Sequence, residues 1–168
     1  MVKKIIGYGL LVILVFFIAI LKIPSTISPS VSKDIKASSI EVQAFLSDIE
    51  KFRMWDPKSI SDSTVSYEFS LDENSPSLQV KDSLNNIVAK YKVEKSTLEE
   101  VQISVDLITV DMFLYTFKFN QVGSVTKVNW SMDVESNLMM SMLGAEKKLE
   151  SMFAKGLDSF QKLVNYTN

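Results

Sequence analysis

The chain has 168 residues, of which 46% are hydrophobic, and a formal net charge of -2 from 18 basic and 20 acidic side chains. This length and composition are typical of one folded domain with a short additional segment, not of a disordered tail. The near balance of charge excludes the basic footprint of most nucleic-acid-binding proteins. The sequence contains no cysteine and no histidine, which excludes thiol nucleophiles, imidazole bases and the common zinc sites. It also lacks an aspartate-rich calcium loop, a phosphate loop and a nucleophile elbow, so no metal or cofactor is expected.

Residues 1–23 predict a membrane element. Lys3 and Lys4 precede an uncharged apolar run from Ile5 to Leu21, which is long enough for a spanning helix. A single-pass anchor, a cleaved signal peptide and a buried core helix are the alternatives. The length of the run and the lack of a small-residue cleavage site favour the anchor. The two lysines in a short terminal tail favour an orientation that places the rest of the chain on the extracytoplasmic side.

Residues 24–31 are rich in proline and serine and predict a short linker, so that the folded domain covers residues 32–168. A first strand is expected from Val31 to Ile35. Ser38 and Glu41 then form a capping-box pattern that predicts the start of a short helix. A second short helix is expected from Ile49 to Trp55, with Pro57 as the residue that ends it.

An alternation of apolar and polar residues follows over six segments, at 65–71, 78–81, 87–94, 101–107, 113–120 and 128–134. Turn signals separate several of them, including the pairs 85–86, 99–100 and 123–124. Strands with one apolar face and one polar face are typical of an antiparallel sheet.

The last segment predicts a long amphipathic helix. Its apolar stripe, at helical spacing, contains Leu149, Met152, Phe153, Leu157, Phe160, Leu163 and Val164. Gly156 interrupts the pattern, and a glycine inside a helix often marks close packing or a bend. This helix is the natural cover for the apolar face of the sheet.

Three stretches in this order carry a resemblance to a known superfamily: Ile35 to Pro57, Tyr115 to Trp130, and Gly156 to Val164. The chain resembles the START-like (SRPBCC) superfamily in its polyketide cyclase/dehydrase-like branch, in which many bacterial members carry one N-terminal anchor. The resemblance covers roughly residues 32–166. It implies an α+β helix-grip fold, with a six- to seven-stranded antiparallel sheet wrapped around the long C-terminal helix. The chain departs from the family where "DENSPSLQV" replaces a glycine-rich stretch.

The resemblance also implies an apolar cavity between sheet and helix that binds a lipid, a polyketide or another hydrophobic small molecule. Some members catalyse cyclisation or dehydration there. The candidate cavity residues are Trp55, Tyr67, Tyr91, Tyr115, Phe117, Trp130, Met152, Phe153, Leu157 and Phe160. For Trp55 the alternative is a packed core residue, and for the tyrosines it is a hydroxyl at the rim or on a backbone carbonyl.

Two further patterns bear on the cavity. Met139, Met140 and Met142 predict a gate, a patch that faces the bilayer, or ordinary packing before the long helix. No carboxylate falls at an inward strand position, and Asp111, Glu99 and Glu100 are expected in solvent, so no acid-base pair is apparent.

Three functions therefore remain open. The first is a membrane-anchored, non-enzymatic domain that holds a hydrophobic molecule or lipid. The second is an enzyme of cyclase/dehydrase type that uses a cavity tyrosine. The third is an interaction module whose core is completely filled and whose protein partner is unknown.

Overall fold

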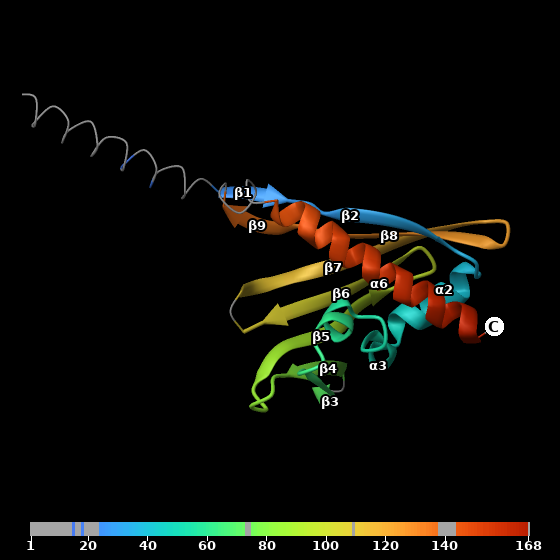
Figure 1. The fold of residues 1–168 in the computed structure, drawn as a ribbon. Helices are drawn as coiled ribbons and strands as arrows, with labels where there is room; N and C mark the ends of the chain where they lie inside the picture. The colour runs from blue at the N-terminus through green and yellow to red at the C-terminus, as the bar shows by residue number, and fades with distance from the viewer. Residues whose placement is uncertain are drawn as a thin grey trace, which may run out of the picture.

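The computed structural model describes residues 24–72, 75–108, 110–137 and 144–167, together with Val15 and Ile18. In this part of the chain an antiparallel sheet packs against one long helix, as Figure 1 shows. The strands of the sheet lie in the order β2-β8-β7-β6-β5-β4-β3. They are β2 (Ser30–Ile35), β3 (Ser66–Asp72), β4 (Ser75–Lys81), β5 (Ile87–Ser96), β6 (Glu100–Leu107), β7 (Val110–Val122) and β8 (Val125–Met132). The expected α+β class and the seven-stranded antiparallel sheet are confirmed.

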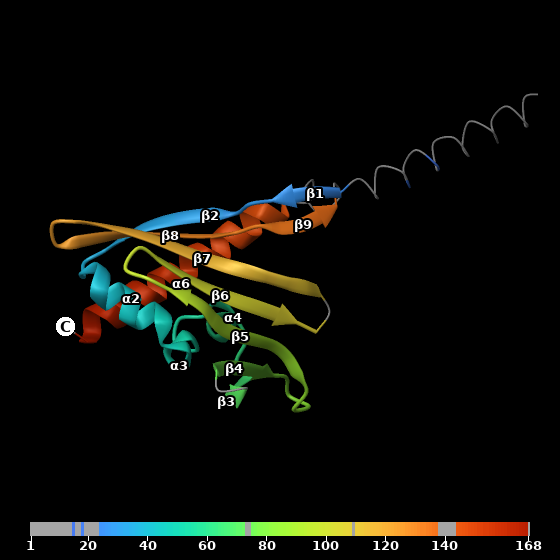
Figure 2. The same ribbon diagram turned by 180° about the vertical axis from the view of Figure 1, so that it is seen from behind.

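The long helix α6 (Ala145–Thr167) runs along one face of the sheet. The view from behind in Figure 2 shows the strands with α6 beyond them. Three short helices lie between β2 and β3 in the chain: α2 (Ser39–Ser47), α3 (Ile49–Phe52) and α4 (Pro57–Ser61). This order of elements is a helix-grip-like arrangement.

Six of the eight residues expected to form a linker, 24–27 and 30–31, are instead paired in strands. β1 (Pro24–Ile27) pairs antiparallel with β9 (Val134–Asn137) in a separate two-stranded sheet, and β2 begins at Ser30. These strands were not predicted because the segment is rich in serine and proline, and both residue types are unusual in strand interiors. Among the described residues, no helix is long and apolar enough to cross a membrane. The expected anchor over residues 1–23 lies outside the described residues, apart from Val15 and Ile18.

The start of α2 follows the capping-box prediction. The hydroxyl oxygen of Ser38 accepts a hydrogen bond from the amide of Glu41 at 3.3 Å. In return, the amide of Ser38 donates to the Glu41 carboxylate at 2.7 Å. The hydrogen bonds from Ser38 hold the pKa of the Glu41 carboxyl below its ordinary value. Two amide groups that have no partner inside the helix are thereby satisfied.

The second short helix ends earlier than expected, and a third one follows it. α3 stops at Phe52, and Trp55 lies in a turn. Pro57 does not end a helix but is the first residue of α4. Proline is favoured there because its fixed φ fits the helix and its missing amide hydrogen has no partner at that position anyway. Asp56 is therefore the residue that precedes α4, and it is itself buried.

The core is formed where α6 crosses the sheet. Phe153, Leu157, Phe160 and Val164 are all fully buried on the face of α6 expected from the sequence. Gly156 allows the closest approach: a Cβ atom placed there would lie 2.6 Å from Cζ3 of Trp130 and 3.0 Å from Cγ of Pro57. The glycine is therefore required for close packing of α6 against β8 and α4.

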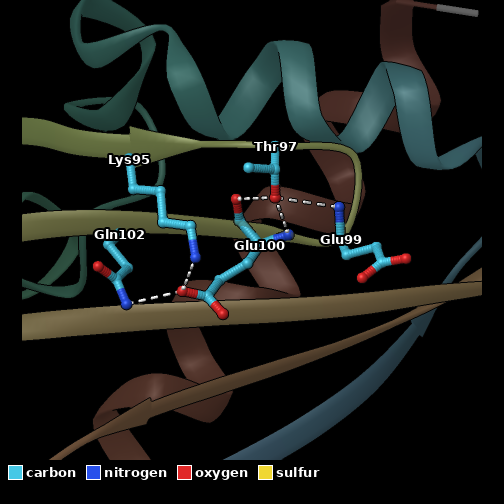
Figure 3. Close-up of polar contacts among 5 residues, drawn as sticks. All are labelled: Lys95, Thr97, Glu99, Glu100 and Gln102. Atoms are coloured by element: carbon cyan, nitrogen blue, oxygen red, sulfur yellow. Dashed lines mark hydrogen bonds and ion pairs between the residues drawn. The ribbon is translucent and has the colours of Figure 1, made fainter.

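A polar network fixes the turn between β5 and β6 (Figure 3). The Thr97 hydroxyl donates to the carbonyl oxygen of Glu100 and accepts from the Glu100 amide, both at 3.1 Å. The Glu100 carboxylate accepts from Lys95 at 3.2 Å and from Gln102 at 2.7 Å. Glu100 thus belongs to an ion-paired network, where the sequence indicated only a solvated turn residue.

Candidate ligand-binding site

A pocket of about 250 Å³ lies between the sheet and the first turns of α6. Strands β5 to β8 supply one wall, α6 supplies another, and the start of α4 lies against the same space. Its lining residues are Asp56, Lys58, Tyr91, Val105, Leu107, Phe113, Tyr115, Met132, Leu149 and Met152. The register of β6 against β7 shifts between Val105 and Leu107, within this wall. Such an irregularity bends the strands locally.

Asp56 is the acidic residue of this pocket, and its side chain is 2% exposed. The hydroxyl of Tyr67 donates a hydrogen bond of 2.6 Å to its Oδ2 atom. Burial raises the pKa of the Asp56 carboxyl above its ordinary value, and the hydrogen bond from Tyr67 and the nearby charge of Lys58 oppose that rise. A buried carboxyl in a pocket, with its protonation state shifted by desolvation, is a candidate functional group.

Two tyrosine side chains lie on the wall near Asp56. Tyr91 is 3% exposed and Tyr115 is 5% exposed. Burial, and secondarily the charge of Asp56, raises the pKa of both hydroxyl groups, so both stay protonated at neutral pH. Neither hydroxyl donates a hydrogen bond to another residue of the described chain. They are therefore donors that a molecule in the pocket can use.

The remaining wall of the pocket is apolar apart from Lys58. Leu107 and Phe113 come from the ends of β6 and β7 that adjoin each other, Met132 from β8, and Leu149 and Met152 from α6. Methionine and leucine side chains adapt to apolar molecules of different shape. The site thus combines an apolar body with a polar end, which is the usual construction of a small-molecule site.

The other aromatic candidates form a packed cluster beside the pocket. Trp55, Phe117, Trp130, Phe153 and Phe160 are fully buried, and so is Leu157. Trp130 stacks on Phe153 with ring centroids 4.3 Å apart, and its ring lies edge-on to Trp55 at 5.7 Å. The indole nitrogen atoms of both tryptophans have no hydrogen-bond partner. The edge-on ring contacts offer these N–H groups only weak acceptors.

The structure therefore divides the ten candidate residues into three groups. Tyr91, Tyr115 and Met152 line the pocket. Tyr67 binds Asp56 and lines a smaller space of about 80 Å³ with Glu50, Arg53, Phe69 and Leu78. The remaining six, Trp55, Phe117, Trp130, Phe153, Leu157 and Phe160, belong to the packed core. Met139, Met140 and Met142 lie outside the described residues.

Sequence reasoning missed Asp56 because it looked for carboxylates only at inward strand positions. Asp56 comes instead from the segment between α3 and α4, and it points toward the sheet. The available signal was the tripeptide Trp55-Asp56-Pro57, in which a carboxylate stands between a large apolar residue and a helix-starting proline. Within 24–72, 75–108, 110–137 and 144–167, acidic side chains do not gather in groups of three that suit a metal ion.

Comparison with known proteins identifies the fold. No family model matches the chain, and no curated protein matches its sequence. Among solved structures, the chain is similar to CV1439 from Chromobacterium violaceum, with a TM-score of 0.61 at 7% identity over 82% of this chain and 97% of that one. TTHA0849 from Thermus thermophilus gives a TM-score of 0.60 at 14% identity, over 84% of this chain and 99% of that one. CalU16 from Micromonospora echinospora gives 0.55 at 10% identity, over 85% and 87% of the two chains. At these identities the similarity shows a shared helix-grip-like fold.

Proposed function

We propose that this chain binds a small hydrophobic molecule in the pocket between the sheet and α6. The observation that carries the proposal is the pocket of about 250 Å³, whose apolar wall ends in Asp56, Tyr91 and Tyr115. Pockets for small molecules usually enclose about 300–1,000 Å³. A volume slightly below that range favours a compact ring system or a single acyl chain over a lipid with two chains.

The order of elements and the shared fold also support assignment to the START-like superfamily. The matching stretches are Ile35 to Pro57 with α2 and α3, the hairpin of β7 and β8, and the end of α6. The solved structures with the same fold cover most of this chain. We assign the chain to the polyketide cyclase/dehydrase-like branch on the three sequence stretches.

We further propose that the domain is held at a membrane by its first segment. The support is the uncharged apolar run from Ile5 to Leu21, flanked by Lys3 and Lys4. The lysines favour an extracytoplasmic position for the pocket domain. We expect the expressed chain to stay in the membrane fraction when membranes are extracted with alkaline carbonate. We also expect its intact mass to include residues 1–23. A mass that lacks these residues would identify a cleaved signal peptide.

Binding is tested by identifying any small molecule that copurifies with the protein. The full-length chain is isolated gently and extracted with organic solvent, and the extract is analysed by mass spectrometry. Met152→Trp fills the pocket, and Met54→Trp adds the same ring at a side chain that is 54% exposed. The proposal is supported if the wild type and Met54→Trp each carry the same compound in an amount equimolar with the protein, and Met152→Trp carries none. Equal traces in all three proteins, after incubation with membrane extract, would favour an interaction module with a filled core.

An enzymatic role is the second candidate, and Asp56 is the observation that favours it. Burial raises the pKa of the Asp56 carboxyl, so it holds a proton for transfer more readily than an exposed carboxyl does, whereas burial makes the three tyrosine hydroxyls still weaker acids than free tyrosine. The same extraction separates the two roles when Asp56→Asn is included. Binding predicts the same compound from both proteins, while catalysis predicts substrate in the variant and product in the wild type.

A further inference from the structure

We propose that the molecule held in this pocket carries an uncharged hydroxyl group, bound at the Asp56 end. This inference rests on the proposed binding function and adds the chemical class of the polar group. It follows from the donors, acceptors and charges that the polar end of the pocket presents.

The pocket offers both kinds of hydrogen-bonding partner at this end. Asp56 accepts a hydrogen bond from Tyr67 at 2.6 Å, and the backbone amides of Lys58 and Ser59 also donate to its carboxyl group. A carboxylate has about four acceptor sites, so about one remains for a donor on the ligand. Tyr91 and Tyr115 supply hydroxyl groups that have no acceptor in the described chain. A ligand group that donates a hydrogen bond to Asp56 and accepts one from a tyrosine hydroxyl gives a partner to both residues. A hydroxyl group can make both hydrogen bonds with a single oxygen atom.

The end of the pocket that holds Asp56 selects against ionised groups on the ligand. Asp56 and Lys58 both line the pocket, so a ligand carboxylate near Lys58 would also face Asp56, and a ligand ammonium near Asp56 would also face Lys58. Neither ion therefore meets a partner of opposite charge alone. Either ion would also lose its water in a site whose walls are mostly apolar. A neutral hydroxyl avoids these costs.

The rest of the ligand is expected to be apolar. Beyond the polar end, the wall consists of Leu107, Phe113, Met132, Leu149 and Met152 together with Val105. No further polar group of the ligand would find a partner among these side chains. The preferred ligand is therefore an apolar alcohol or phenol of compact shape.

Four compounds with one carbon skeleton test this inference: menthane, menthol, menthylamine and menthane carboxylate. Each is titrated by calorimetry into the full-length chain in lipid nanodiscs, with empty nanodiscs as the blank. Menthol is expected to bind about thirtyfold more tightly than menthane, since its hydroxyl gains two hydrogen bonds of about 1 kcal/mol each and about 1.4 kcal/mol corresponds to a factor of ten. The amine and the carboxylate are expected to bind more weakly than menthol.

Variants locate the selectivity at the polar end. Tyr91→Phe and Tyr115→Phe should each reduce the preference for menthol over menthane several-fold. Tyr166→Phe, at a side chain that is 90% exposed, is the matched control and should leave this preference as it is in the wild type. Asp56→Asn should improve the relative binding of the carboxylate, and Asp106→Asn, on the exposed side of β6, should not.

The outcomes distinguish this inference from the proposed function. Equal binding of menthane and menthol, or tightest binding of an ionised compound, would overturn the hydroxyl class while leaving the apolar pocket in place. A preference for menthol that survives in both tyrosine variants would also overturn it. Failure of all four compounds to bind would overturn the proposed function together with the inference.

Discussion

Tyr67 on β3 and Asp56 before α4 are joined by a hydrogen bond of 2.6 Å that ties the edge of the sheet to the segment beneath α6. Asp56 is almost fully buried, so this bond satisfies part of a costly polar group. Tyr67→Phe removes the donor without changing the shape of the ring. We expect a loss of about 1.5–3 kcal/mol in the free energy of unfolding, the range for hydrogen bonds to charged groups.

A double-mutant cycle with Asp56→Asn shows whether the Tyr67 effect acts through the carboxyl. The two substitutions should be clearly non-additive in urea denaturation. Tyr166→Phe at the end of α6 is the control for the loss of a tyrosine hydroxyl and should be neutral. Additive effects of the two changes would show that the pair does not interact in solution.

Asp56 should also make stability depend on pH. Its pKa in the folded chain is raised from 3.8 by burial, so the folded protein keeps the proton at pH values where the unfolded chain has lost it. Stability contributed by Asp56 is therefore greatest below 3.8 and declines as the pH rises toward the folded pKa. Asp56→Asn cannot titrate and lacks this decline.

The free energy of unfolding of Asp56→Asn, relative to wild type, should rise across this window. The expected rise is about 1.4 kcal/mol for each pH unit between the two pKa values. Urea denaturation over a pH series measures it, with Asp106→Asn as the control for removing one exposed aspartate. A difference between Asp56→Asn and wild type that is the same at every pH would contradict the burial of an ionisable group.

Gly156 should not tolerate a side chain. Alanine is favoured over glycine inside a helix by about 1 kcal/mol, but its Cβ atom would lie 2.6 Å from the ring of Trp130. We expect Gly156→Ala to destabilise the domain by about 1–3 kcal/mol, the usual cost of overpacking. Ser151→Ala, at an exposed position of α6, is the control. Thermal unfolding would contradict the packing of α6 if Gly156→Ala were more stable than wild type.

The turn between β5 and β6 depends on the Thr97 hydroxyl. Thr97→Val keeps the shape of the side chain but removes the bonds to the amide and carbonyl groups of Glu100. A loss of about 1 kcal/mol in the free energy of unfolding is expected, in line with a net hydrogen-bond contribution. Thr97→Ser keeps the hydroxyl and should behave like wild type. A loss of stability in Thr97→Ser with none in Thr97→Val would contradict this and point to the methyl group instead.

Much of the fold follows from periodicity. The alternation from residue 65 to 134 predicted the strands of the main sheet, and the stripe around Phe153 and Phe160 predicted the buried face of α6. Both patterns are local consequences of which side faces the core. The pairing of β1 with β9 was not predictable in this way, because its strands are short and rich in proline and serine. Their pairing joins residues more than a hundred positions apart.

The site was less predictable than the fold. The alternation of side chains along a strand shows which of them point inward, and it correctly selected Tyr91 and Tyr115 as inward residues. The alternation does not show where side chains fill the core and where they leave a cavity. Trp55, Trp130 and Phe153 fill one part completely, while smaller side chains leave space beside the first turns of α6. Asp56 reaches that space from a turn, where neither strand nor helix periodicity applies.

If the space between the sheet and the start of α6 is a binding pocket, the methyl groups of the methionines that line it should respond directly to a bound molecule. The full-length chain in nanodiscs, labelled on its methionine methyl groups, is titrated with menthol and followed by NMR. Menthol in the pocket should shift the methyl resonances of Met132 and Met152, which line it, and should leave that of the exposed Met54 unshifted. Unchanged Met132 and Met152 resonances, or equal shifts at Met54, would contradict it.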